Sequence, residues 1–107
     1  MNDGDALRVG VGPVLQATPF ADAVIAAIEG ENDQVIVRDE GAYLRVLCPG
    51  ICRLTRAAVE AETGYPVRFP GDLEVIMSSF AGKVDMTEDA AVWWLATDRS
   101  PHQPSGA

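Results

Sequence analysis

"QVIVRDEGAYLRVLCPGICRL", residues 34–54, is the stretch that decides the fold, because two turns divide it into three apolar segments. The turns are Asp39-Glu40-Gly41 and Pro49-Gly50, and the second has Pro and Gly at the positions that a tight turn favours. The segments between the turns are rich in β-branched and other apolar residues, which is typical of strands. We therefore predict consecutive strands over residues 34–38, 42–48 and 51–53.

The two segments that flank these three predicted strands carry helix signals. Thr18-Pro19 supplies an N-cap and a first-turn proline, and Gly30 is the expected end of that helix. Apolar residues then recur on one face at helical spacing, namely Phe20, Ala23, Val24, Ala27 and Ile28. Thr55 is the expected cap of a second helix that runs to about Thr63, with Gly64 beyond its end.

The remaining strands are predicted from apolar residues at alternating positions. The expected segments are a strand over residues 9–15 interrupted near Gly12-Pro13, a strand over 73–77, and a final hairpin over 84–95. In the second of these, Leu73, Val75 and Met77 alternate as a strand with Glu74 outward and lead into a loop, Ser78–Gly82.

The resulting element order is β-α-β-β-β followed by α-β-β-β. It predicts an α+β fold with mixed, largely antiparallel sheets and two main helices packed on one side. A chain of 107 residues forms one domain. We expect a flexible N-terminal arm over residues 1–8, a single domain over 9–97 and a disordered C-terminal tail over 98–107.

The charge balance excludes several classes of partner. The chain has 16 acidic and 8 basic residues, a net charge of -8, and no basic patch in its sequence. Nucleic acids and anionic membranes are therefore not expected partners. The sequence has no secretory signal at its polar N-terminus and no apolar run near the roughly 20 residues of a membrane span, so we expect a cytoplasmic protein.

The sequence offers no catalytic constellation, no cofactor motif and no metal site. Cys48 and Cys52 flank the Pro49-Gly50 turn as buried strand residues, and the single histidine, His102, lies in the C-terminal tail. Ser78 and Ser79 have no base nearby in the sequence, and the paired acids lie at predicted turns. We therefore expect a protein that is not itself an enzyme.

Four stretches together resemble a known family. They are VGVGPVL (Val9–Leu15), VIVRDEGAYLRV (Val35–Val46), LTRAAVEAETGYPVRF (Leu54–Phe69) and LEVIMSSFAGKV (Leu73–Val84). In order, spacing and chain length they resemble the coupling, or effector (regulatory), proteins of soluble di-iron multicomponent monooxygenases. The resemblance covers residues 9–95. The enzymes of this family oxidise methane, phenol, toluene and alkenes.

The resemblance implies a function for the Ser78–Gly82 segment. Proteins of this family bind no cofactor and dock on the hydroxylase above its di-iron centre. The segment that resembles the family's docking surface contains Ser78, Ser79, Phe80, Ala81 and Gly82. Phe80 is expected to be either an anchor in the hydroxylase interface or a plug of the protein's own core, and both alternatives stay open at this point.

The resemblance also implies a mechanism and a set of partners. Docking would shift the hydroxylase between conformations, so that electron delivery and oxygen activation are coupled to substrate oxidation. The electron-donating ferredoxin would compete for an overlapping surface. A short arm and the Ser-Ser-Phe-Ala-Gly sequence favour an alkene or aromatic hydrocarbon as the substrate of the partner. The alternative function is a stand-alone α+β domain that binds a ligand or another protein.

Overall fold

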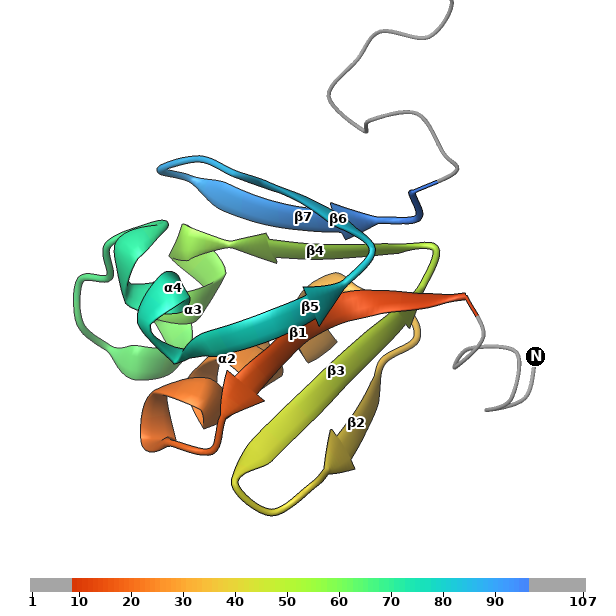
Figure 1. The fold of residues 1–107 in the computed structure, drawn as a ribbon. Coiled ribbons are helices and arrows are strands. Elements are labelled where there is room, and N and C mark those ends of the chain that lie inside the picture. The colour runs from red at the N-terminus through yellow and green to blue at the C-terminus, as the bar shows by residue number, and fades with distance from the viewer. Residues whose placement is uncertain (1–8, 97–107) are drawn as a thin grey trace, which may run out of the picture.

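The computed structural model describes residues 9–96, which form two antiparallel sheets and three helices (Figure 1). The four-stranded sheet has the order β2 (Ile36–Asp39), β3 (Tyr43–Pro49), β1 (Gly10–Gln16) and β5 (Met77–Ala81). The three-stranded sheet has the order β4 (Ile51–Thr55), β7 (Ala90–Trp94) and β6 (Lys83–Met86). The helices are α2 (Pro19–Glu31), α3 (Arg56–Thr63) and α4 (Gly71–Ile76). The arm and tail predicted for residues 1–8 and 98–107 lie outside the described residues.

Two glycine turns carry the chain from one sheet to the other. Gly50 (φ 77°) lies between β3 and β4, and Gly82 (φ 92°) lies between β5 and β6. Both have the left-handed backbone that glycine adopts without steric cost. The predicted turn at Pro49-Gly50 is therefore present, but β4 does not return along β3. It pairs with β7 instead, with Cys52 opposite Trp93.

Helix α2 begins as predicted and ends later than predicted. The Thr18 hydroxyl accepts a hydrogen bond from Ala21 N at 3.1 Å, and Pro19 occupies the first helical position. Gly30 does not end the helix, which continues to Glu31 with Asn32 as the C-cap. The Asn32 side-chain amide donates to Ile28 O at 2.8 Å and so satisfies a free carbonyl of the last turn.

Helix α3 agrees with the sequence at both ends. Thr55 is the N-cap, and its hydroxyl accepts a hydrogen bond from Ala58 N at 3.2 Å. Gly64 follows the helix with φ 77°, and its N–H donates to Glu60 O at 2.8 Å. These are the N-terminal threonine cap and the C-terminal glycine that the pattern predicts.

The strand predicted over residues 73–77 is wrong, because residues 71–76 form helix α4. Leu73 and Ile76 are buried at i, i+3 spacing, whereas Val75 lies exposed between them. The Asp72 carboxylate accepts a hydrogen bond from Arg68 N at 2.8 Å, and Glu74 N donates to Pro70 O at 2.9 Å. These local hydrogen bonds favour the helical turn over an extended segment of the same apolar residues.

The loop predicted at Ser78–Gly82 is also wrong, since residues 77–81 form strand β5. Strand β5 pairs with β1, which runs through Gly12-Pro13 without the expected interruption. Gly12 lets β1 lie close to Val46 of β3, because a Cβ atom at position 12 would collide with the carbonyl oxygen of Val46. The absence of a side chain therefore lets β1 continue where the sequence suggested a break.

One hydrophobic core joins both sheets and the helices. Its fully buried members include Val11 and Leu15 of β1, Val24 and Ile28 of α2, Val46 of β3, Leu54 of β4, Leu73 of α4 and Trp93 of β7. In Figure 1, α2 lies behind β1, with α3 and α4 at the same end of the molecule. The α+β fold class is thus confirmed, with a third helix that the sequence did not predict.

Candidate functional site

Strand β5 holds four of the five predicted docking residues and lies at an edge of the four-stranded sheet. It pairs with β1 on one side, with Ser79 opposite Val14 and Phe80 opposite Pro13. Within residues 9–96 no strand pairs with its other side. Such an edge exposes backbone donors and acceptors that a partner is able to use.

Ser78 has a structural role in this strand. The register shifts between the Ser79–Val14 and Met77–Leu15 pairs, so Ser78 has no opposite residue on β1. Its hydroxyl donates to Val14 O at 3.3 Å, which ties the irregular residue to the neighbouring strand. Irregularities of this kind change the direction in which nearby side chains point.

Ala81 and Gly82 lie where the chain leaves the four-stranded sheet. Ala81 is half-buried opposite Gly12, and Gly82 has φ 92°. A Cβ atom on Gly82 would lie 2.5 Å from the Trp94 carbonyl oxygen and 2.7 Å from a methyl group of Val11. Gly82 is therefore required for close packing between the two sheets.

Phe80 is the exposed apolar side chain of the segment. Its exposed fraction is 43%, and it is not among the side chains that form the core or pack against it. The core-plug alternative is therefore wrong. Ser78, Ser79 and Gly82 are also exposed, and Ala81 alone of the five predicted residues is half-buried.

A second surface feature lies next to β5 and was not predicted. Phe20 of α2, Tyr65 after α3, and Asp72, Val75 and Ile76 of α4 line a hollow of about 330 Å³. Val75 was assigned to a strand in the sequence, and Phe20 to a buried helix face. The signal that identifies the hollow is an exposed apolar position, Val75, on a helix whose other apolar residues are buried.

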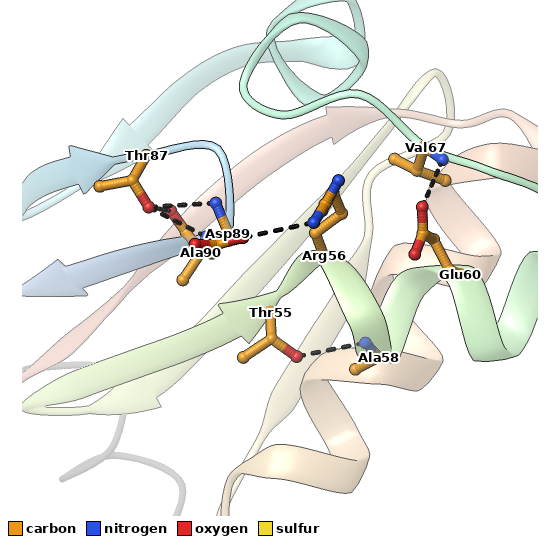
Figure 2. A network of polar contacts seen from close by, with 8 residues as sticks. All are labelled: Thr55, Arg56, Ala58, Glu60, Val67, Thr87, Asp89 and Ala90. Carbon is orange, nitrogen blue, oxygen red and sulfur yellow. Dashed lines mark hydrogen bonds and ion pairs between the residues drawn. The ribbon is translucent and has the colours of Figure 1, made fainter.

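Around α3, in contrast, polar side chains are bound to the protein itself (Figure 2). Glu60 accepts a hydrogen bond from Val67 N at 2.8 Å, and Arg56 lies 3.3 Å from the Asp89 carboxylate. The Thr87 hydroxyl accepts from Asp89 N and Ala90 N, which closes the turn between β6 and β7. These contacts hold secondary-structure elements together and do not form a catalytic arrangement.

The two cysteines lie where the sequence predicts, on β3 and β4 beside the Pro49-Gly50 turn, and both are buried. A hydrogen bond from Cys52 lowers the pKa of the Cys48 thiol, against the opposing effect of burial. The same hydrogen bond, together with burial, raises the pKa of Cys52. Cys48 is thus the first of the pair to ionise, but its burial keeps it from reacting with solvent molecules.

The described residues contain no cluster of side chains suited to binding a metal ion. Between residues 9 and 96, no three or more His, Cys, Asp or Glu side chains are grouped so as to hold a metal ion. His102 lies outside this range. No helix of the described chain is long and apolar enough to cross a membrane.

The fold and its surface agree with comparisons to known proteins. Residues 10–94 match the MmoB/DmpM family. This chain belongs to that family. It is 37% identical over 86 residues to the effector subunit of the alkene monooxygenase system of Xanthobacter autotrophicus (strain ATCC BAA-1158 / Py2), and the match covers 78% of this chain and 84% of that subunit.

The MmoB/DmpM fold is also present among solved structures. A chain in the structure of a phenol hydroxylase–regulatory protein complex matches with a TM-score of 0.71, over 79% of this chain and 95% of that one. Because the two sequences are only 18% identical, this match is evidence for a shared fold and not for a shared function. The family and the alkene monooxygenase relative identify this MmoB/DmpM protein as an effector component of a multicomponent monooxygenase, and not as its catalytic component.

Proposed function

We propose that this effector protein docks on the di-iron hydroxylase of its monooxygenase through the exposed part of β5. The observation that carries the proposal is Phe80, a large apolar side chain that is exposed on an edge strand. Exposed aromatic residues at the centre of an interface contribute a large share of binding energy. A structural relative in a complex of phenol hydroxylase and regulatory protein supports a partner of this kind.

Some of the five predicted residues contact the hydroxylase, and others stabilise the conformation of β5. Ser78, Ser79 and Phe80 contact the hydroxylase directly, because all three are exposed. Ser78 also fixes the strand irregularity beside them through its hydrogen bond to Val14 O. Ala81 and Gly82 hold the end of β5 against the second sheet. The segment thus acts as a rigid docking strand.

Docking changes the hydroxylase by binding one of its conformations more tightly than another. A difference in binding free energy of about 3 kcal/mol changes the ratio of two conformations by more than a hundredfold. The effect couples electron delivery and oxygen activation to substrate oxidation. No group on the effector needs to take part in the chemistry.

The substrate of the partner hydroxylase is an alkene or an aromatic hydrocarbon. The relative from the alkene monooxygenase system favours the first, and the fold likeness to a phenol hydroxylase regulatory protein is compatible with the second. The electron-donating ferredoxin competes for an overlapping surface of the hydroxylase. The effector therefore acts between electron-transfer steps.

Reconstitution tests this function directly. The hydroxylase, reductase and ferredoxin of the same system are assayed with propene or toluene, with and without this protein, and product is measured per NADH consumed. We expect the protein to raise this ratio and to raise the apparent Kd of the ferredoxin. An unchanged product yield with a folded effector would contradict the coupling function, and an unchanged ferredoxin Kd would contradict the competition.

A further inference from the structure

The hollow next to β5 is lined in part by exposed apolar side chains, whose exposure the packing of the fold does not explain. Its lining residues are Phe20, Tyr65, Asp72, Val75 and Ile76. We propose that it is a second anchor site for the hydroxylase, and that it receives an apolar side chain with a Lys or Arg beside it. This inference rests on the proposed docking function. It adds the surface of α4 to that of β5.

The exposure of the lining supports a binding role. Val75 is 76% exposed and Tyr65 is 53% exposed, the two highest values among the large apolar side chains of residues 9–96. Single exposed apolar residues are common on protein surfaces, but two that border one hollow are more informative. Because the other walls are also largely apolar, an apolar side chain fits the hollow better than a polar one.

The walls of the hollow are held in place before any partner binds. The Thr63 hydroxyl accepts a hydrogen bond from Tyr65 N at 3.2 Å and donates to Tyr65 O at 3.0 Å. Helix α4 is fixed by the buried side chains of Leu73 and Ile76. A backbone that is already fixed adds no ordering cost when a partner binds, which favours these residues as anchors.

The charges around the hollow determine the chemistry of the partner. Asp22, Asp72 and Glu74 lie on or within two positions of the lining residues, and no Lys or Arg lies within that distance in the sequence. Arg68 lies just outside it and uses its backbone N–H to bind Asp72. Three acidic residues and one basic residue, Arg68, thus lie at or next to the hollow, and the net negative charge of this rim complements a basic residue next to the inserted apolar side chain.

The hollow and the docking strand are close enough for one partner to cover both. Helix α4 ends at Ile76 and β5 begins at Met77, so Phe80 follows Val75 by five positions with four residues between them. Five residues span at most about 18 Å. An interface of standard size covers about 800 Å² on each partner, on the order of 30 Å across, and thus includes both features.

Calorimetric titration of the full-length effector into its hydroxylase, with thermal melts of each variant, tests this site. Tyr65→Ala and Val75→Ser should each raise the Kd about tenfold, as loss of an interface anchor does. Val75 is so exposed that its replacement leaves folding intact, which keeps the test valid if Tyr65→Ala destabilises the protein. Tyr43→Ala is the matched control, because Tyr43 is 42% exposed on β3.

The acidic rim is tested by reversing the charge of one exposed residue beside the hollow and of one exposed control residue elsewhere. Glu74→Lys should raise the Kd several-fold at low salt, and this effect should decrease at high salt. Glu88→Lys makes the same charge change in the turn between β6 and β7 and should have a smaller effect. Equal effects of the two reversals would overturn the assignment of the charged rim.

The outcomes distinguish this inference from the docking function on which it rests. If the wild-type protein does not bind the hydroxylase, the docking function itself fails. If Phe80→Ala weakens binding but folded Tyr65→Ala and Val75→Ser bind as the wild type does, only the second anchor site is wrong. If these variants instead abolish self-association without changing the hydroxylase Kd, the hollow binds a second copy of this chain and the inference is overturned.

Discussion

The surface around α3 and the surface formed by α4 and β5 differ in how their side chains are used. Around α3, Thr55, Arg56 and Glu60 bind other parts of the protein (Figure 2). On α4 and β5, Val75 and Phe80 are large apolar side chains that remain exposed. Apart from the Arg56 Nε atom, which has no hydrogen-bond partner among residues 9–96, these polar groups are bound within the chain, whereas the second surface has apolar area left for a partner.

This difference teaches where to look for function in a protein without catalytic groups. Polar residues at helix caps and turns lower the free energy of the fold, so their presence on a surface does not indicate binding. Exposed apolar residues stabilise the free protein little, and two of them beside an unpaired strand edge point to an interface. The comparison predicts that mutations on the two surfaces separate stability from binding.

The largest effect is expected at Gly82, where the chain passes from β5 in one sheet to β6 in the other. Gly82→Ala should lower the free energy of unfolding by about 2–5 kcal/mol, the sum of a left-handed alanine and a forced clash with Trp94 O and Val11. Urea denaturation of purified protein measures this loss. Binding should decrease only through unfolding.

Gly41→Ala is the matched control for Gly82→Ala. Gly41 also has a positive φ, 85°, but no atom lies within 4 Å of the position of its Cβ. Its replacement should cost only the backbone term, about 1–2 kcal/mol. Equal losses at both sites would contradict the close packing at Gly82.

The next largest effect is expected at Phe80, on binding and not on stability. Phe80→Ala should weaken the complex with the hydroxylase by about 1–4 kcal/mol, because an exposed aromatic anchor is lost. The melting temperature should change little, because Phe80 does not contribute to the core. Calorimetric titration and thermal melts of the same samples separate these effects.

Tyr43→Ala serves again as the control, since Tyr43 and Phe80 have nearly equal exposed fractions, 42% and 43%. Tyr43 pairs with Gln16 at the end of β1, whereas Phe80 pairs with Pro13. Tyr43→Ala should leave the hydroxylase Kd unchanged. If Phe80→Ala melts normally and binds as tightly as the wild type, the docking role of β5 is wrong.

The sequence predicted elements whose ends have specific side-chain signals. Helix α3 carries Thr55 and Gly64 at its ends, and α2 begins at Thr18, so local hydrogen bonding determines each boundary. The hairpin of β6 and β7 was also predicted, from its alternating apolar residues. The end of α2 was missed because the Asn32 side chain, which also binds β4, replaces a glycine stop.

The region from α4 to β5 was not predicted correctly, and the reason is physical. Leu73, Val75 and Met77 fit an alternating strand, whereas Leu73 and Ile76 fit one turn of helix, so six residues do not distinguish the two. The pairing of β5 with β1 depends on Gly12, which is distant in sequence. The family resemblance identified residues 78–82 as a candidate site, but only the fold shows that Phe80 is exposed and that Tyr65 lies near Val75.

The smallest effect is expected at Thr55, on the satisfied surface. Thr55→Ala should lower the free energy of unfolding by about 0.5–2 kcal/mol, because α3 loses the cap of Ala58 N and the hydroxyl contact with Glu31. Thr55→Ser keeps the hydroxyl group and should recover most of this stability. Both variants should bind the hydroxylase with the wild-type Kd at temperatures where they are folded, because this surface is used within the chain. A tenfold rise in Kd for folded Thr55→Ala, reversed by Thr55→Ser, would instead place α3 in the interface and remove the distinction between the two surfaces.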